Sequence, residues 1–150
     1  MKISIILLTF LVSSIYQEQF YTGKITRVID GDTFVMQTIT GSVKVRLDGI
    51  DCPENKQPYS AESKAFLSKF LNLGSKIHKK GTDRYGRVLG VLWVEGININ
   101  LLMVKEGYPW HFKKYSKDTA LAEAEIKARE NKKGLWKDPN PIAPWDWRKK

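Results

Sequence analysis

Acidic residues are the minority charge in this chain, and four of them stand in two short groups. Asp30 and Asp32 flank a single glycine, and Asp51 and Glu54 flank a Cys-Pro pair. Carboxylates that converge with a backbone carbonyl and water form the ligand set of a hard cation such as Ca²⁺ or Mg²⁺. Each group also has an ordinary explanation, because Asp-Gly is a frequent hairpin turn and Asp-x-Pro-Glu can open a loop. Together they predict a cation site if neighbouring strands carry them.

Three arginines are candidates for phosphate binding, one near the second acidic group and two in a separate predicted turn. Arg46 precedes Asp51 by five residues, and Arg84 and Arg87 flank a Tyr-Gly pair in a predicted tight turn. The planar fork of arginine binds two phosphate oxygens at once, which lysine does not do. The alternative is an ordinary solvated strand face and a basic loop. The arginines therefore indicate phosphate binding only in combination with the carboxylates.

A third group, residues 108–115, alternates aromatic side chains with lysines. Such a surface can stack nucleic-acid bases and neutralise phosphates. Aromatic residues at this density are equally typical of a hydrophobic core. The sequence leaves both interpretations open.

Short strands must position these residues. Partial period-two alternation and turn-forming residues predict three antiparallel strands, at residues 23–29, 33–38 and 43–48, and a later strand at 88–94. Apolar spacing predicts three helices, at residues 60–71 with Ser60 as N-cap, 98–106 and 118–131. Strands followed by helices indicate an α+β fold, and short, strongly turned strands are compatible with the five-stranded OB-fold barrel.

The composition restricts the partners. The formal net charge is +9, which favours a polyanion, either nucleic acid or an anionic membrane. Cys52 is the single cysteine, so no intramolecular disulfide can form. The two histidines lie far apart in the sequence, which makes a zinc site improbable.

The two ends of the chain differ from the middle. Residues 3–15 are uncharged and apolar, too short to span a bilayer but typical of a secretory signal, so we expect residues 1–17 to be a signal peptide. A core strand or helix is the alternative. The protein would then be secreted or periplasmic. Residues 138–150 are rich in Pro and Trp and are expected to lie extended over the surface.

The order of motifs resembles the staphylococcal nuclease (thermonuclease) family. The motifs that carry the resemblance are VIDGDT at residues 28–33, VRLDGIDCPE at 45–54 and DRYGR at 83–87. The resemblance covers about residues 23–136 and places an SNase-like domain at residues 20–137. It implies an OB-fold barrel carrying three helices, and a Ca²⁺-dependent endonuclease that cleaves DNA, RNA or both and leaves 3′-phosphate ends.

The resemblance also assigns roles around the cation. Asp32 and Asp51 would bind Ca²⁺ with the backbone carbonyl of Cys52. Glu54 would act as the general base.

Further roles concern the substrate. Arg46 and Arg87 would hold the scissile phosphate and stabilise its transition state, and the residues that bind the nucleotide around it would be Arg84, Tyr85 and Tyr115. We expect a monomer without a stable protein partner. Contact with a membrane is expected only if the signal peptide stays uncleaved.

Some positions depart from the family pattern. Cys52 replaces a threonine, and Lys113 stands where a second nucleotide-contacting tyrosine is frequent. Residues 74–81 are fewer than usual, which predicts a shortened or missing strand before Arg84. The loop at residues 55–59 is also brief, so substrate preference can differ.

Two other functions compete with catalysis. A non-catalytic OB-type nucleic-acid-binding module would be expected to lack some of the catalytic residues, yet all five are present: Asp32, Arg46, Asp51, Glu54 and Arg87. A cationic membrane-surface protein would need a long basic amphipathic helix, which residues 118–131 do not resemble.

Overall fold

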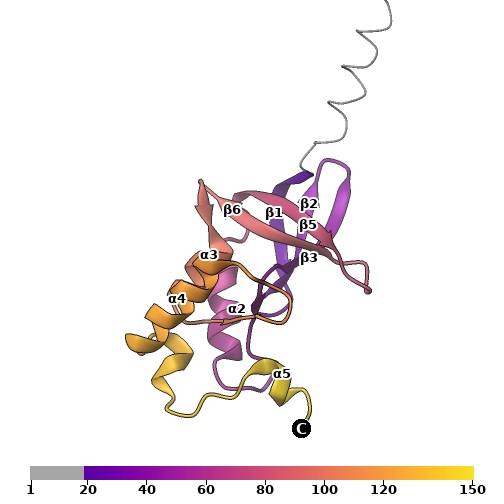
Figure 1. The fold of residues 1–150 in the computed structure, drawn as a ribbon. Helices are drawn as coiled ribbons and strands as arrows, with labels where there is room; N and C mark the ends of the chain where they lie inside the picture. Colours follow the sequence, from indigo (N-terminus) through magenta and orange to yellow (C-terminus); the bar gives the residue numbers. More distant parts are fainter. Residues whose placement is uncertain (1–18) are drawn as a thin grey trace, which may run out of the picture.

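The strands close into a barrel. The computed structural model describes residues 19–150, and its main sheet runs in the order β3-β2-β1-β5-β6 (Figure 1). Parallel pairing of β3 with β6 closes the barrel, with Val45 opposite Val88. The barrel strands are β1 (Phe20–Val28), β2 (Thr33–Thr38), β3 (Gly41–Leu47), β5 (Gly74–Thr82) and β6 (Val88–Val94).

Shorter elements complete the fold. The two-residue strands are β4 (Ile50–Asp51), which pairs with β8 (Trp110–His111), and β7 (Ile97–Asn98), which pairs with β6. The helices are α2 (Ser60–Ser68), α3 (Ile99–Lys105), α4 (Thr119–Glu130), the 3₁₀ helix η2 (Gly134–Lys137) and the one-turn helix α5 (Pro144–Trp147). Together they confirm the predicted α+β fold with an OB-type barrel.

Alternating burial explains the barrel interior. Along β6 the side chains of Val88, Leu92 and Val94 are buried, while the intervening residues are only partly covered. Phe34 and Met36 on β2 are fully buried in the same core. Since successive strand residues point to opposite faces, this pattern fills the barrel with apolar side chains.

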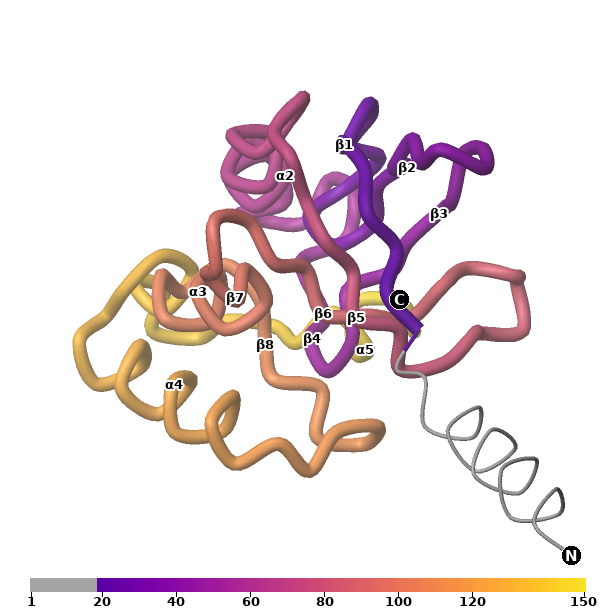
Figure 2. Tube along the Cα trace, turned by 90° about the horizontal axis from the view of Figure 1, so that it is seen from above, coloured from indigo at the N-terminus to yellow at the C-terminus, as the bar shows by residue number. Residues whose placement is uncertain are grey.

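The helices pack below the barrel in Figure 1, and the C-terminal segment returns beneath them. Asn98 caps α3 by accepting from the Leu101 amide, and Asp118 caps α4 in the same way. Seen from above, α5 lies beside β4, although the two are far apart in the sequence (Figure 2).

Three expectations from the sequence were wrong. Ser60 does not cap α2; the N-cap is Tyr59, which has a left-handed φ of 70° and no capping side-chain hydrogen bond. The strand before Arg84 is not lost, because β5 extends over nine residues. The tail is not extended throughout, since α5 forms within it.

The predicted signal peptide, residues 1–17, lies outside the described residues. Among residues 19–150, no helix combines the length and apolar character needed to cross a membrane. The division of the chain into residues 1–17, 20–137 and 138–150 stays a prediction.

Candidate functional site

One cleft of about 890 Å³ opens at the end of β2 and β3. Every site residue expected from the sequence lines it: Asp32, Arg46, Asp51, Cys52, Glu54, Arg84, Tyr85, Arg87 and Tyr115. These residues come from five separate segments, so the barrel assembles what the sequence keeps apart.

A tight turn between β1 and β2 places Asp32. The carboxylate of Asp30 accepts the Asp32 amide at 3.0 Å, which closes the turn. Gly31 is required by close approach, because a Cβ there would lie 2.8 Å from the Cβ of Cys52. The Cys52 amide in turn donates to Asp32 Oδ2 at 2.7 Å. The two acidic motifs are therefore directly bonded to each other.

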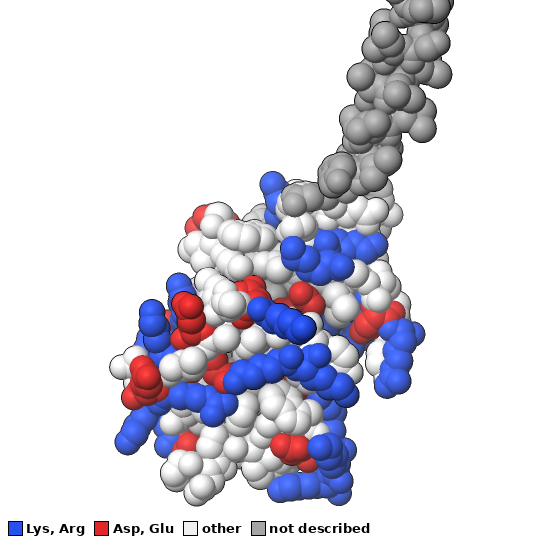
Figure 3. All heavy atoms as spheres, viewed as in Figure 1, with Lys and Arg blue, Asp and Glu red and all other residues white. Residues whose placement is uncertain are grey.

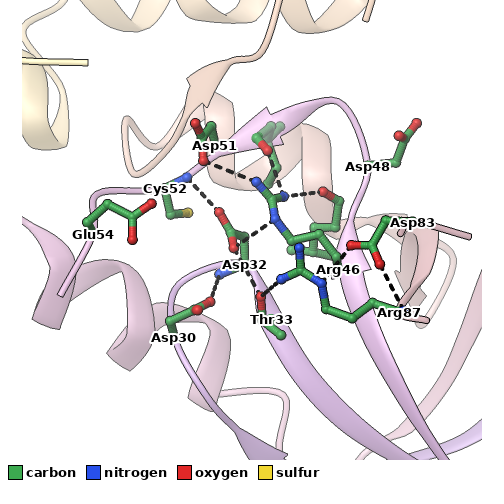
Figure 4. A network of polar contacts seen from close by, with 12 residues as sticks. Asp30, Asp32, Thr33, Arg46, Asp48, Asp51, Cys52, Glu54, Asp83 and Arg87 are labelled. Carbon is green, nitrogen blue, oxygen red and sulfur yellow. Dashed lines mark hydrogen bonds and ion pairs between the residues drawn. The ribbon is translucent and has the colours of Figure 1, made fainter. Parts of the chain in front are cut away.

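Arg46 joins the two buried carboxylates (Figure 4). Its Nε lies 3.2 Å from Asp32 Oδ1, and its Nη2 lies 3.1 Å from Asp51 Oδ1. Its Nη1 donates to the backbone carbonyls of Leu47 and Ile50 at 2.6 and 2.8 Å. These contacts hold the guanidinium at a fixed place between β3 and β4.

Burial governs the electrostatics of this group. It raises the pKa of Asp32 to about 7, although the charge of Arg46 acts in the opposite direction. Burial alone would lower the pKa of Arg46, but Asp32 and Asp51 raise it above its ordinary value. The arginine therefore stays charged, whereas the negative charge on Asp32 is incompletely compensated.

A second network orients Arg87. Its Nε lies 2.7 Å from Asp83 Oδ2, and its Nη1 donates to Thr33 Oγ1 at 3.5 Å (Figure 4). Asp83 also accepts the amides of Tyr85 and Arg87, so one carboxylate shapes the whole turn. Burial would raise the pKa of Asp83, but the hydrogen bonds from Arg87 and the turn amides lower it.

The turn and a second loop present exposed aromatic rings to the cleft. Tyr85 is 68% exposed and Tyr115 is 69% exposed. The guanidinium of Arg84 lies 4.8 Å from the Tyr85 ring centre, and Phe112 supports Tyr115 edge-on at 4.8 Å. Rings held in this way can stack on bases.

Residues 108–115 were predicted to form either part of the core or a nucleic-acid-binding surface, and the structure contains both kinds of residue. Tyr108 stacks on Phe66 at 4.6 Å, as a core residue does. Phe112 and Tyr115 line the cleft. Lys113 pairs with buried Glu125 at 3.4 Å, while its side chain remains 66% exposed.

Arg148 also lines the cleft, although the sequence predicted only an extended tail in this region. Its Nη2 lies 2.9 Å from Asp51 Oδ2, and its Nη1 pairs with Glu54. The hydrogen bonds that Arg148 donates to Asp51, and to a lesser extent to Glu54, raise the pKa of Arg148, although burial acts against them. The tryptophans before Arg148 were the one available signal, since they can anchor a tail to a surface.

The donor set is compatible with a hard divalent cation. In the part of the chain that the structure describes, no three His, Cys, Asp or Glu side chains gather closely enough to hold a metal alone. Ca²⁺ also accepts backbone carbonyls and water, so two carboxylates are a sufficient protein contribution. Asp32 and Asp51 are both buried, and carboxylates buried in this way are normally paired with a cation or bound to a metal. The residues present therefore fit Ca²⁺ in their chemistry.

Basic side chains extend beyond the cleft. Figure 3 shows Lys and Arg spread across the face that it presents, interrupted by Asp and Glu. With a net charge of +9, such a surface attracts polyanions at a distance before any specific contact forms.

Known proteins resemble this chain over most of its length. A Haemophilus influenzae protein named "Uncharacterized endonuclease" is 40% identical over 146 residues, which cover 96% of this chain and 82% of that protein. An Escherichia coli protein of the same name is 39% identical over 129 residues, 84% of each chain. "Micrococcal nuclease" from Shigella flexneri is 35% identical over 141 residues, 86% of this chain and 81% of that protein.

A family model described as "Staphylococcal nuclease homologue" matches residues 44–138, which run from within β3 through η2 and include the site residues from Arg46 to Tyr115. The chain therefore belongs to the family of staphylococcal nuclease homologues.

Proposed function

We propose that this protein is a Ca²⁺-dependent nuclease that hydrolyses phosphodiester bonds in DNA, RNA or both. Family membership supports nuclease activity. The observation that carries the proposal is the convergence in one cleft of the predicted site residues: the carboxylates Asp32, Asp51 and Glu54 and the arginines Arg46, Arg84 and Arg87. A phosphodiester is anionic, so its hydrolysis needs positive charge at the phosphate and a base for the attacking water.

The carboxylates divide into two roles. Asp32 and Asp51, with the backbone carbonyl of Cys52, would hold Ca²⁺, which when bound supplies positive charge to the phosphate and orients water. Glu54 lines the cleft with a side chain that is 39% exposed. It is open to water and would accept the proton of the attacking molecule.

The arginines stabilise the charge that develops on the phosphate. Arg46 is oriented by Asp32 and Asp51, and Arg87 is oriented by Asp83. Donors held in place before the reaction lower the barrier because they need no reorganisation during it. Attack on phosphorus with loss of the 5′-oxygen would leave the 3′-phosphate ends expected from the sequence.

A paired digest tests the reaction and its metal. The mature chain is incubated with single-stranded DNA and with RNA, in Ca²⁺ and in excess chelator. We expect digestion in Ca²⁺ only, with products that a polymerase extends only after phosphatase treatment. Undiminished cleavage in chelator would exclude the metal role. Tight, salt-sensitive DNA binding without hydrolysis would instead favour the non-catalytic module.

Glu54→Gln tests the base. The rate should fall by about 10²-fold or more, because the amide cannot accept the proton. Glu62→Gln, an exposed carboxylate of the first turn of α2, is the matched control and should leave the rate unchanged. A near-normal rate for Glu54→Gln, with folding confirmed by circular dichroism, would remove Glu54 from the base role.

We also propose export, with residues 1–17 as a cleaved secretory signal. Cell fractionation with N-terminal sequencing of the recovered protein tests this, since an intact Met1 in the cytoplasm would contradict it. Sedimentation tests the expected monomer.

A further inference from the structure

The C-terminal tail is seated on the protein. The ring of Trp145 stacks on Phe112 with centroids 5.4 Å apart and planes at 1°, and it meets Trp110 edge-on at 5.5 Å. Ala143 and Pro144 are buried. Aromatic contacts of this kind fix the direction of a short segment as well as its position.

Gln57 ties the tail to the loop of Glu54. Its side-chain amide donates to the carbonyl of Ile142 at 2.7 Å and accepts the backbone amide of Glu54 at 2.9 Å. Gln57 is buried, so both hydrogen bonds are sheltered from water. The tail and the proposed base are therefore parts of one packed unit.

Helix α5 carries Arg148 from this anchor into the cleft. Pro144 occupies the start of the helix, where its ring is favourable, and the Arg148 amide donates to the Pro144 carbonyl at 3.0 Å. Trp145 and Arg148 are three residues apart, so a helical turn places them on the same face. The anchor and the guanidinium thus point to the same side of the tail.

The guanidinium covers the open side of Asp51. Its Nη2 donates to Asp51 Oδ2 at 2.9 Å and its Nη1 to Asp51 Oδ1 at 3.3 Å, and Nη1 also pairs with Glu54. This is the paired geometry in which arginine binds carboxylates most strongly. The Asp51 side chain is 3% exposed, whereas that of Arg148 is 41% exposed. Arg148 can therefore withdraw toward solvent, and Asp51 cannot.

The carboxylate oxygens of Asp32 are also occupied, and Asp51 Oδ1 has a second contact. Arg46 holds Oδ1 of both aspartates, and the Cys52 amide holds Asp32 Oδ2. Arg46 is enclosed and fixed by two backbone carbonyls, which leaves Arg148 as the exchangeable cation among these contacts. A divalent cation that uses Asp51 must replace this contact or bind beside its positive charge.

We propose that Arg148 is the internal counter-cation of the site: it neutralises Asp51 and Glu54 while no metal is bound, and its release from Asp51 sets the affinity for a divalent cation. The proposal rests on the proposed Ca²⁺ site. It makes the tail a part of the site, and Arg148 a residue that determines cation affinity by holding the ligand Asp51.

The test is the affinity of the full chain for Ca²⁺ without substrate, measured by titration calorimetry after removal of metal. Arg148→Gln should bind Ca²⁺ roughly tenfold more tightly or better, because a positive charge next to the cation is removed. Lys149→Gln is the matched control: it removes the same charge one residue further on, where the side chain pairs with Asp146 and not with the site. It should stay within about twofold of the parent chain, because an exposed charge outside the site is screened.

Arg148→Lys keeps the charge but loses the fork, and should give an intermediate affinity. This variant also keeps the test valid if Arg148→Gln folds poorly. Thermal unfolding supplies a second readout: Arg148→Gln should lower the melting temperature in chelator and increase the rise caused by Ca²⁺.

The outcomes separate the two proposals. If the parent chain binds Ca²⁺ and Arg148→Gln binds it no more tightly than Lys149→Gln, the role of Arg148 is wrong and the Ca²⁺ site stands. If neither the parent chain nor any variant binds Ca²⁺ and chelator leaves the digest unchanged, the metal assignment fails and the role of Arg148 fails with it.

Discussion

The cleft has two halves that differ in how they are held. The barrel half, defined as Asp32, Arg46 and Asp51, lies on the barrel strands or next to them, with the Arg46 and Asp51 side chains only 13% and 3% exposed. The loop half, defined as Tyr85 and Tyr115, lies on two loops and is more than two-thirds exposed. One half is enclosed and charged, and the other is open and aromatic.

The difference separates two tasks. Charged groups interact most strongly where water is excluded and where their positions are fixed. Such groups are suited to stabilising a transition state. Exposed rings accept any base face, so they suit binding of a varied polymer. The halves should therefore respond differently to substitution, the barrel half in rate and stability, and the loop half in affinity.

The same Arg→Lys change, made in the barrel half and at Arg84 beside Tyr85 of the loop half, tests this most strongly. Arg46→Lys keeps the charge but loses the fork between two carboxylates, and we expect the rate to fall by about 10²–10³. Arg84→Lys changes an exposed arginine beside Tyr85. It should reduce kcat/KM by less than about tenfold, mainly by raising KM. Steady-state kinetics on one oligonucleotide compare them. Equal losses in kcat would abolish the distinction between the halves.

The second prediction concerns the support of the barrel half. The side chain of Asn100 accepts the Leu92 amide and donates to the carbonyls of Asp48 and Gly90, which holds the chain between β3 and β4. Asn100→Ala removes these partners from the Leu92 amide and the Asp48 carbonyl, whereas the Gly90 carbonyl still accepts the Asp48 amide, and it should destabilise the protein by about 1–3 kcal/mol.

Urea unfolding measures this change in stability. Asn131→Ala is the control, because its amide makes one exposed hydrogen bond and its loss should cost less than about 0.5 kcal/mol. An equal loss of unfolding free energy in both variants would show that the buried hydrogen bonds of Asn100 stabilise the protein no more than an exposed one.

The smallest expected effect belongs to the loop half. Tyr85→Ala and Tyr115→Ala should each raise KM by roughly fivefold, the equivalent of about 1 kcal/mol for one stacked base. Stability and kcat should stay near the parent values. Phe20→Ala, an exposed ring outside the cleft, should change neither parameter. A fall in kcat with unchanged KM would place these rings among the groups that act on the transition state.

The residues of the barrel half could be predicted from the sequence because they lie in short, recognisable motifs. The Asp30–Asp32 turn and the Arg46–Asp51 segment each lie within one short motif, and hairpin connections bring such motifs together. The bounds of β2 and β6 were also predicted correctly, since alternation continues through both strands.

Other features depend on contacts that the sequence does not display. Arg148 meets Asp51 across 97 positions, and although the nearby tryptophans can indicate an anchored tail, nothing local marks Arg148 as a partner of Asp51. Ser60 has the residue type of an N-cap, but a left-handed Tyr59 occupies that position. Strand β5 has weak alternation and is held in place by its partners β1 and β6.

The separation of 97 positions between Arg148 and Asp51 also has a kinetic consequence. Strands β1, β2 and β3 pair with neighbours along the chain, so the entropy of closing their loops is small. The contact of Arg148 needs the helices and the tail in place first, and contacts between distant residues form slowly. During folding, the buried carboxylates should therefore gather around Arg46 before Arg148 arrives, so a pulse-labelling experiment should find the tail among the last segments to become protected.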